Sequence, residues 1–443
     1  MAVPGAAVAE GRKLFGTDGV RGVAGEAVTA ELALSLARAA TTRAATPDEH
    51  PPKVLVIRDT RESGEMLEAA VAAGVTAAGG EVLLGGILPT PGAALLVRRH
   101  GFDLAVVLSA SHNPYRDNGI KFFGGDGYKL SDASELEIER MLEATPAPAR
   151  PGRVRRFHGA LDGYEAALMA RFGHLDLTGR RLLLDCANGA TFEAGPATFR
   201  RLGANVDVIA AEPIGRNIND GCRSTHIEAL TQTMREGDFD AGFAFDGDGD
   251  RVLAVDRNGV VVDGDELIAL AAVHLKVPGV AVTVMTNYGF HTGMGAAGIQ
   301  VVTTPVGDRY VLDALRERHW TLGGEQSGHI IEMGFAPSGD GIAGALLTLE
   351  ALGDGDLADR RAMEKLPQKL VNVRVRDRDA VEDSAAVRDA VERESEALVG
   401  RGRVLLRPSG TEPLVRVLVE APTADEADAV CDRLAALVGD ELA

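Results

Sequence analysis

Residues 106–123 read VVLSASHNPYRDNGIKFF, and the rest of the chain can be interpreted outward from this stretch. The apolar run 104–108 predicts a buried strand that leads into two serines, Ser109 and Ser111. The polar residues 112–114 then break the pattern and predict a loop at the end of the strand. Such a loop is also ordinary turn chemistry, and by itself the turn is the simpler interpretation. Because side chains alternate along a strand, both serines are expected on the same face.

The composition is that of an acidic globular chain. At roughly 150 residues per domain, its length predicts about three domains, with two to four compatible. The 443 residues include 45% hydrophobic and 25% charged ones, a mixture typical of globular proteins. Lys and Arg (46) are outnumbered by Asp and Glu (65), which gives a net charge of −19. Surfaces that bind nucleic acid need clustered positive charge, so no nucleic-acid partner is expected.

The sequence contains no pattern typical of a membrane span or a secretory signal. The charge-free stretch 277–307 includes Pro278, Pro305 and many polar residues, so no membrane partner is expected. The N-terminus lacks an early basic region and a sustained apolar core. We therefore expect a cytoplasmic protein with a loose N-terminal tail. Three widely spaced cysteines, without zinc or redox spacing, are expected to be buried thiols: Cys186, Cys222 and Cys431.

Strand-like and helix-like segments alternate along the chain, which predicts α/β units with parallel or mixed sheets. The proline-rich segment 144–152 predicts an exposed connector near a domain boundary. The expected strands are 54–57, 81–84, 104–108, 182–185, 206–209, 280–285, 300–304 and 371–376, and the expected helices are 28–45, 66–78, 192–202, 266–275 and 380–398.

The segment DGDGDR is the most informative part of the chain for metal binding. Asp246, Asp248 and Asp250 alternate with glycines that permit tight curvature, so three carboxylates can project to one side. Like charges held this close need a cation. A calcium-binding EF-hand loop is excluded, because its sixth position would be Arg251 instead of glycine and its twelfth Arg257 instead of glutamate. A site with only a few oxygen ligands from the protein is typical of Mg²⁺, because this ion keeps coordination positions for a phosphate oxygen and water.

Three further segments carry groups that suit a sugar phosphate. LFGTDGVRG places Arg21 among glycines, which suits an anion, although a glycine-rich turn is the simpler interpretation. GGEQSGHII has Glu325, Ser327 and His329 at alternate positions, so an extended segment would direct them to one face, toward sugar hydroxyls or solvent. RPSGTEPLVR concentrates the ingredients of an anion-binding nest: Arg407, Ser409, Gly410, Thr411 and Arg416.

In this order, FGTDGVRG, SASHNPYRDNGIKFF, DGDGDR, GGEQSGHI and RPSGTEPLVR closely resemble the motifs of the α-D-phosphohexomutase superfamily. The resemblance spans nearly the whole chain. It implies an α/β protein of four domains in a heart-shaped arrangement, in which three related α/β domains precede a smaller C-terminal α+β domain. The expected domains are 1–160 with the phosphoserine loop, 161–261 with the metal loop, 262–370 with the sugar-recognition loop, and 371–443 with the phosphate-binding loop.

The resemblance implies a role for each motif. Ser111, and not Ser109, would carry the phosphate, which would complete the coordination of Mg²⁺ by the three aspartates. The segment around Glu325 would bind the sugar, and RPSGTEP would hold the phosphate that does not react. Arg21 and Arg251 could neutralise charge on the transferred phosphoryl group. His112 and Lys121 are candidate proton carriers.

The implied reaction interconverts glucosamine 6-phosphate and glucosamine 1-phosphate through phosphorylated Ser111 and a glucosamine 1,6-bisphosphate, which is intermediate and activator. Its product would supply UDP-N-acetylglucosamine and cell-wall synthesis. Gln326 favours this branch of the superfamily, because glucose- and mannose-phosphate relatives tend to carry methionine there. The alternatives are a phosphoglucomutase or phosphomannomutase, and a non-catalytic sugar-phosphate-binding regulator. A homodimer stays open.

The loop 215–230 departs from the resemblance. Relatives that act on glucosamine phosphates usually have CGSTH, followed by proline, whereas this chain has Arg223 and Ile227 at the second and sixth of these positions. These changes leave the catalytic set intact and bear on domain packing, oligomer contacts or fine substrate preference. Asn217 and Asn219 of the same loop are interpreted as ordinary turn residues.

Overall fold

The computed structural model describes residues 13–16, 18–45, 50–142, 150–222, 224, 226–377, 379–381, 383–408 and 413–442. The chain divides into two compact units, one of Met1–Met285 and Gln300–Arg360 and the other of Thr286–Ile299 and Arg361–Ala443. The expected N-terminal tail and most of the expected connector lie outside the described residues. No described helix combines the length and the apolar character that crossing a membrane requires.

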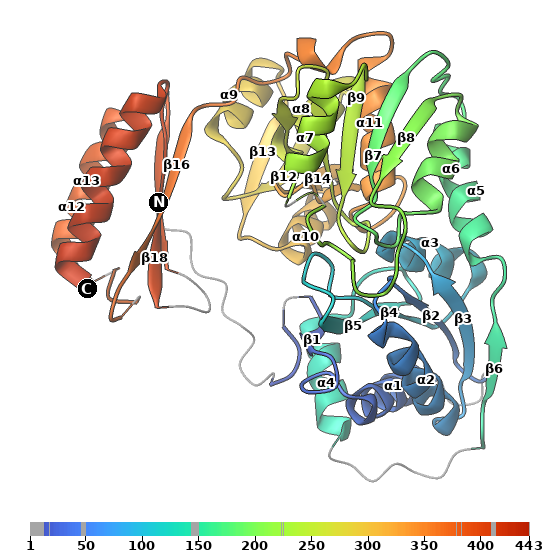
Figure 1. Cartoon of the computed structure of the whole chain (residues 1–443). Coiled ribbons are helices and arrows are strands. Elements are labelled where there is room, and N and C mark those ends of the chain that lie inside the picture. The colour runs from blue at the N-terminus through green and yellow to red at the C-terminus, as the bar shows by residue number, and fades with distance from the viewer. Residues whose placement is uncertain are drawn as a thin grey trace. The chain divides into compact units, whose positions relative to one another are not determined.

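The first sheet of the larger unit has the strand order β1-β5-β4-β2-β3-β6. Strands β2, β3, β4 and β6 are parallel, whereas β5 is antiparallel to both β4 and β1. Helices α1, α2 and α4 pack on one face and α3 on the other, as Figure 1 shows. The strands are β1 (Val20–Val23), β2 (Lys53–Arg58), β3 (Glu81–Ile87), β4 (Leu104–Leu108), β5 (Asp117–Gly124) and β6 (Arg153–Arg156), and the helices are α1 (Ala30–Ala44), α2 (Ser63–Ala77), α3 (Thr90–His100) and α4 (Asp132–Leu142).

Every residue of β4 is buried, because helices cover the sheet on both faces. That burial explains the uninterrupted apolar run that precedes the two serines. The polar residues begin at the carboxyl end of the strand, directly after Leu108.

The second sheet has the order β11-β10-β9-β7-β8. Strands β7, β8 and β9 are parallel, and β10 is antiparallel to β9, so DGDGDR is the tight connection between two buried antiparallel strands. Its strands are β7 (Arg181–Asp185), β8 (Asn205–Ile209), β9 (Ala241–Phe245), β10 (Val252–Asp256) and β11 (Val261–Val262), and its helices are α5 (Ala160–Phe172), α6 (Ala194–Arg201) and α7 (Glu228–Glu236).

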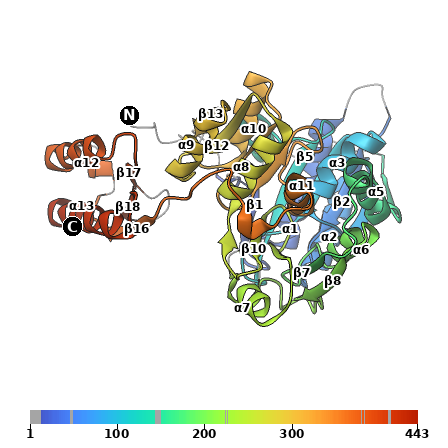
Figure 2. The same cartoon turned by 90° about the horizontal axis from the view of Figure 1, so that it is seen from above.

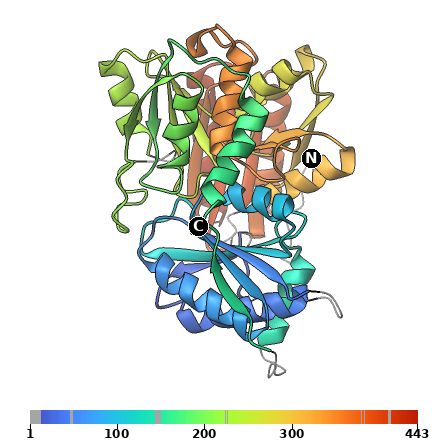
Figure 3. The ribbon, with the colours of Figure 1, turned by 90° about the vertical axis from the view of Figure 1, so that its right-hand side faces the viewer.

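The third sheet has the order β13-β12-β14-β15, with β14 and β15 forming an antiparallel hairpin. Helix α11 packs against α8 of this part and against β9 and β10 of the second sheet. Figure 2 shows α11 between these parts, and Figure 3 shows it in orange beside the green helix α5. The elements are α8 (Gly264–Leu275), β12 (Gly279–Thr283), β13 (Gln300–Thr304), α10 (Asp308–Arg318), β14 (Leu322–Gly324), β15 (Ile330–Glu332), α11 (Gly341–Leu352) and the 3₁₀ turn η1 (Leu357–Asp359).

The smaller unit contains an antiparallel sheet of order β16-β18-β17, covered on one face by α12 and α13 (Figure 1). Alternate residues of β18, Val415, Val417 and Val419, are buried in its core. Helix α9 is held to the sheet where Tyr288 N donates to Glu420 Oε2 at 2.7 Å. The elements are α9 (Tyr288–Ala296), β16 (Gln368–Arg374), the 3₁₀ turn η2 (Asp379–Val381), α12 (Ala385–Ala397), β17 (Arg403–Pro408), β18 (Leu414–Glu420) and α13 (Ala424–Leu442).

The expected fold class is confirmed, with three α/β parts followed by an α+β part. The expected strands and helices form with ends that differ by a few residues, except that the expected helix 380–398 is divided into the 3₁₀ turn η2 and the helix α12, which begins at Ala385. Strand β12 ends at Thr283 instead of residue 285, because Thr283 Oγ1 accepts a hydrogen bond from Met285 N (3.3 Å) and a turn begins. The three cysteines are buried, as expected. The four domain limits stay a prediction.

Candidate active site

The two serines that follow β4 lie in different environments. Ser109 Oγ donates to Asp59 Oδ2 (2.6 Å) and accepts from Ser111 N (2.9 Å), so its hydroxyl is held inside the first sheet. Ser111 has a φ of +51°, in the left-handed region. The expectation that both serines share a strand face is therefore wrong, because the strand ends at Leu108 and the backbone reverses at Ser111.

The hydroxyl of Ser111 faces the loop between β9 and β10. Its Oγ lies 2.6 Å from Asp246 Oδ2, to which it donates a hydrogen bond. Arg251 Nη2 donates to the same Oγ from 3.2 Å. Ser111 itself is fully buried. The first and second sheets thus bring one hydroxyl, one carboxylate and one guanidinium together.

The three aspartates form a buried cluster, as the sequence predicts. One carboxylate oxygen from each lies within 4.8 Å of the others. Asp248 Oδ2 accepts from Thr90 Oγ1 (2.7 Å) and Lys121 Nζ (2.8 Å). Oδ1 of Asp248 and of Asp250 accepts no hydrogen bond from any described residue. Two unbonded buried carboxylate oxygens in one cluster fit a hard cation, so the donor set suits Mg²⁺.

Crowding of the carboxylates changes their acidity. Burial raises the pKa of Asp246 well above its ordinary value, and the neighbouring charges of Asp250 and Asp248 raise it further. Burial and the charge of Asp250 raise the pKa of Asp248, the charge and the hydrogen bond of Lys121 lower it, and the net pKa lies below the ordinary value. The cluster therefore carries its full negative charge only at a cost that a bound cation would offset.

Lys121 lies on β5 and is almost completely buried. Its Nζ contacts Asp248 (2.8 Å) and Asp18 (3.0 Å). Asp18 also pairs with Lys129, which reaches Asp308 Oδ2 of the third part at 2.7 Å. Burial alone would lower the pKa of Lys121, but Asp18 and Asp248 raise it above its ordinary value. Lys121 is therefore held as an ammonium, whose positive charge could neutralise phosphate charge.

His112 is a neutral imidazole beside two arginines. Burial, together with the neighbouring charges of Arg251 and Arg21, lowers the pKa of His112 to about 4. Arg251 Nη2 donates to His112 Nδ1 at 2.9 Å. Arg21 pairs with Asp18, and its Nε has no hydrogen-bond partner among the described residues. Arg251 therefore contacts both Ser111 and His112, and Arg21 lies close enough to lower the pKa of His112, so guanidinium charge that suits a phosphoryl group is available here.

Residues 325–329 form a hairpin turn between β14 and β15 instead of an extended segment, so the expectation that three side chains share one face is wrong. Glu325 N donates to His329 O (3.1 Å), and Gly328 has a φ of +89°. Gly328, the one glycine of residues 325–329, allows the reversal. Glu325 Oε1 accepts from Gly307 N (3.1 Å), and Ser327 is exposed.

His329 lies beside Asp250 of the aspartate cluster. Its Nε2 accepts a hydrogen bond from Gly339 N at 3.0 Å, so this nitrogen carries no proton. Its Nδ1 lies 3.6 Å from Asp250 Oδ2. The ring is buried between these two partners. The third part of the larger unit thus places Glu325 and Ser327 at the turn. It also places His329 beside Asp250, a candidate metal ligand.

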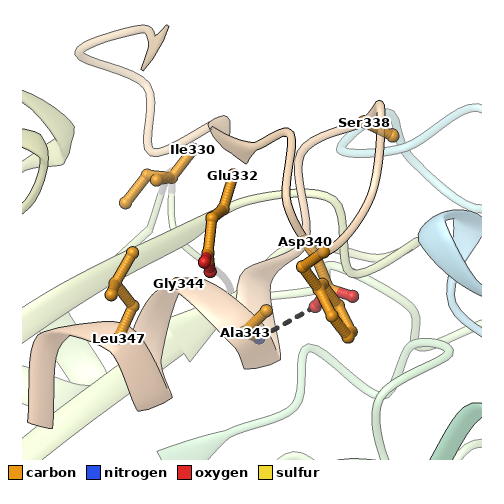
Figure 4. A pocket seen from close by; sticks show the side chains of 8 residues that line it. Ile330, Glu332, Ser338, Asp340, Ala343, Gly344 and Leu347 are labelled. Carbon is orange, nitrogen blue, oxygen red and sulfur yellow. Dashed lines mark hydrogen bonds between the residues drawn. The ribbon is translucent and has the colours of Figure 1, made fainter. Parts of the chain in front are cut away.

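The cavity in Figure 4 is lined by residues of β15, of α11 and of the segment between them, and it is distinct from the site. It measures about 10 Å³, enough for about one water molecule. Asp340, which lines it, accepts from Ala343 N (2.9 Å) at the start of α11 and from the Tyr164 hydroxyl. Burial raises the pKa of Asp340 to about 7.

In the smaller unit, Arg407 and Arg416 are direct partners on β17 and β18. The described residues offer no hydrogen-bond partner to Arg416 Nε. Burial lowers the pKa of Arg407, and the charge of Arg416 lowers it further. Like charges directly opposite each other are destabilising unless an anion joins them. The other predicted residues of this motif, Ser409, Gly410 and Thr411, lie outside the described residues.

Four family models, each described as a domain of phosphoglucomutase/phosphomannomutase, match the chain. The three alpha/beta/alpha domains match residues 12–148 (domain I), 162–259 (domain II) and 263–370 (domain III), and the C-terminal domain matches 370–437. Proteins curated as phosphoglucosamine mutases are 48% identical in Parafrankia sp., 47% in Deinococcus deserti and 44% in Bacillus subtilis. Each alignment covers 96–97% of this chain and 98–99% of the relative. The chain belongs to the phosphoglucomutase/phosphomannomutase family.

Solved structures of this family share the fold. A phosphoglucomutase/phosphomannomutase family protein from Burkholderia thailandensis matches with a TM-score of 0.81 and 23% identity, covering 97% of this chain and 98% of that one. The N-acetylphosphoglucosamine mutase of Aspergillus fumigatus, solved with GlcNAc-6P and magnesium, matches with a TM-score of 0.66 and 18% identity, covering 97% and 96%. At these identities the likeness concerns the fold.

For this phosphoglucomutase/phosphomannomutase family member, the sequence interpretation missed several residues that support the site. Thr90 binds Asp248, and Asp18 and Lys129 extend the ion pairs of Lys121. Asn219, interpreted as a turn residue, is buried and donates to Ser111 O at 2.9 Å.

Asp59 and Arg61 were also missed, although the sequence carried a usable signal. They follow β2, which lies parallel to β4 in the same sheet. The carboxyl ends of adjacent parallel strands lie at one edge, so polar residues after β2 should meet those after β4.

Proposed function

We propose that this family member is a phosphoglucosamine mutase, which interconverts glucosamine 6-phosphate and glucosamine 1-phosphate. The curated relatives at 44–48% identity carry that name over nearly their whole length. The observation that carries the mechanism is the position of Ser111 Oγ, 2.6 Å from Asp246 and within reach of Arg251. A hydroxyl between a metal-type carboxylate and a guanidinium is placed to carry a phosphoryl group.

In the first transfer, the phosphoryl group on Ser111 Oγ passes to the O1 hydroxyl of glucosamine 6-phosphate. The Oγ–P bond breaks as the O1–P bond forms, and the product is glucosamine 1,6-bisphosphate. His112, which is neutral, is the candidate to take the O1 proton, and Lys121, which is protonated, is the candidate to return one to Ser111 Oγ. Arg251 and Arg21 offset the charge of the phosphoryl oxygens.

Asp246, Asp248 and Asp250, with an oxygen of the phosphoserine, would hold Mg²⁺. When bound, the ion withdraws charge from the phosphoryl oxygens. The Aspergillus structure solved with magnesium supports this choice of metal.

In the second transfer, the bisphosphate presents its other end. The 6-phosphoryl group moves to Ser111 Oγ, so the O6–P bond breaks, the Oγ–P bond reforms and the serine proton is transferred to O6. The sugar hydroxyls would be bound by Glu325, Ser327 and His329. Arg407 and Arg416, opposed on β17 and β18, would clamp whichever phosphate does not react, with Ser409, Gly410 and Thr411 of the same motif.

The remaining sequence predictions form part of the proposal. The enzyme would act in the cytoplasm, use glucosamine 1,6-bisphosphate as activator, and supply UDP-N-acetylglucosamine synthesis. Its four domains would have the limits predicted from the sequence. Whether the active form is a homodimer is a question for sedimentation.

Substrate specificity tests the proposal. Purified protein with Mg²⁺ and a trace of hexose 1,6-bisphosphate is given glucosamine, glucose or mannose 6-phosphate, and each 1-phosphate is followed by ³¹P NMR. The expected result is the highest kcat/KM for the glucosamine phosphates. A higher kcat/KM for glucose or mannose phosphate would identify a phosphoglucomutase or phosphomannomutase. Tight binding without any conversion would instead identify a regulator.

A further inference from the structure

The guanidinium of Arg61 lies inside the loop that carries Ser111 and binds the backbone of that loop. Arg61 is completely buried. Its Nη2 donates to Ser111 O (2.9 Å) and Asn113 O (2.8 Å). Its Nη1 donates to Asp117 O (2.9 Å) and to Pro114 O. One side chain therefore binds four carbonyl groups of the seven residues 111–117.

The fifth donor of the same guanidinium fixes its orientation. Arg61 Nε donates to Asp59 Oδ2 at 2.9 Å, and Asp59 Oδ1 accepts from Arg61 N at 3.0 Å. The same Oδ2 accepts from Ser109 Oγ, which in turn accepts from Ser111 N. The network therefore reaches Ser111 from both its carbonyl and its amide group. All five N–H groups of a planar, rigid fork are used.

A second donor reaches the loop from the second sheet's part of the unit. Asn219 Nδ2 donates to Ser111 O (2.9 Å) and Asn113 O (3.1 Å), the same two carbonyls that Arg61 Nη2 binds. Asn219 is buried and has a φ of +61°. Asn tolerates that conformation better than most residues.

We propose that Arg61 is a positioning residue for phosphoryl transfer, which holds the Ser111 loop in its reactive shape with Asn219 as a second donor. The proposal rests on the proposed function and deepens it. Ser111 has a left-handed φ, a conformation that costs free energy and persists only when its surroundings hold it. Four carbonyl groups bound to one guanidinium provide that restraint.

The restraint matters most between the two transfers. After the first transfer Ser111 carries no phosphate, so no phosphate oxygen ties it to the metal cluster. Ser111 Oγ must still attack the second phosphoryl group, forming Oγ–P, breaking O6–P and releasing its proton to O6. If the Ser111 side chain is not held in position, the bisphosphate can dissociate before Oγ attacks its second phosphoryl group. Loss of Arg61 therefore predicts slower return of phosphate and more bisphosphate in solution.

The test compares Arg61→Lys with Asn219→Asp and with Arg216→Lys as the matched control. Lysine keeps the buried charge but lacks the planar fork, and aspartate keeps the shape of asparagine but lacks the donors. Arg216 is an exposed arginine that pairs with Glu62. Each protein is phosphorylated with glucose 1,6-bisphosphate, and the phosphate on Ser111 is counted by intact mass. The measured ratio is bisphosphate released to solution per turnover of hexose phosphate.

For Arg61→Lys we expect kcat to fall about 100-fold with KM nearly unchanged, and the release ratio to rise at least ~10-fold. Asn219→Asp should change both in the same direction by less, and Arg216→Lys should match the wild type. If Arg61→Lys does not fold, Asn219→Asp carries the test. An unchanged release ratio in the folded variants overturns the proposal, because a purely structural defect lowers all products together. Wild-type conversion of glucose or mannose phosphate alone would change the proposed substrate, and the ratio measured with that substrate would still test Arg61.

Discussion

Ser111 Oγ and Asp246 Oδ2 lie 2.6 Å apart, although 135 positions separate the two residues in the chain. One follows a strand of the first sheet and the other connects two strands of the second. The contact places the serine hydroxyl at the edge of a buried carboxylate cluster whose pKa values are pushed apart by crowding. Under the proposed function, phosphoryl transfer and metal binding would therefore occupy the same small volume.

Asp246→Asn should separate metal binding from folding. The variant removes one of three buried like charges, so in EDTA its thermal midpoint should be equal to or above that of the wild type. Mg²⁺ should raise the midpoint of the wild type clearly and that of the variant little, because ligand binding stabilises the folded state. Activity should fall ~100-fold or more. The control is Asp238→Asn, a fully exposed carboxylate. An equal Mg²⁺ shift in both variants would contradict the metal site.

Arg416→Gln should weaken substrate binding without harming the smaller unit. Removing one of two opposed arginines relieves repulsion on the sheet, so the thermal midpoint should stay the same or rise. A lost charge-assisted hydrogen bond of about 1.5–3 kcal/mol should raise KM for hexose phosphates ~10- to 100-fold. Steady-state kinetics measure KM, and Arg433→Gln, which removes a surface pair with Glu394, is the control. An unchanged KM would exclude Arg416 from the phosphate clamp.

Asp340 should make the folded protein less stable as pH rises from about 4 to 7. Its pKa is about 7 in the folded state, above the ordinary value of 3.8, so folding binds a proton in this window. The stabilisation by the Asp340 proton is complete below the ordinary pKa of 3.8 and is lost as the pH rises to the folded-state pKa of about 7. Between these values the free energy of unfolding falls by up to about 1.4 kcal/mol per pH unit. Asp340→Asn should abolish this dependence while still capping α11.

Thermal midpoints across pH 4.5–8 measure this effect. The midpoint of Asp340→Asn minus that of the wild type should increase as pH rises. The exposed substitution Asp238→Asn should show a constant difference. A constant difference for Asp340→Asn as well would mean that Asp340 titrates alike in folded and unfolded protein.

Lys129→Met should destabilise the larger unit. Lys129 pairs with both Asp18 and Asp308 and is largely buried, so its loss leaves two carboxylates without their cation. Removing one partner of a buried pair costs about 3–5 kcal/mol, which should lower the thermal midpoint by several degrees. Lys369→Met, which removes an exposed pair with Asp432, should change the midpoint little. Equal shifts in the two variants would show that Lys129 is not a structural ion-pair centre.

The sequence could predict the elements and the metal loop, because both are written in local patterns. The run 104–108 is buried on both faces, and DGDGDR encodes its own curvature and its own charge. The turn at residues 325–329 was mispredicted because alternation suggests a strand, whereas the conformation is set by Gly328 and by the hairpin partner. The distinct environments of Ser109 and Ser111 depend on Asp59, which lies 50 positions earlier in the chain. Only the pairing of β2 with β4, and no local pattern, indicates this contact.

Transfer of labelled phosphate from Ser111 tests the account most directly. Wild-type, Ser111→Ala and Ser109→Ala proteins are incubated with ³²P-labelled hexose 1,6-bisphosphate, freed of ligand and then given glucosamine 6-phosphate and Mg²⁺. We expect one label per chain on the wild type and on Ser109→Ala, released into glucosamine phosphates, and none on Ser111→Ala. Label retained on Ser111→Ala, or absent from Ser109→Ala alone, would contradict the account.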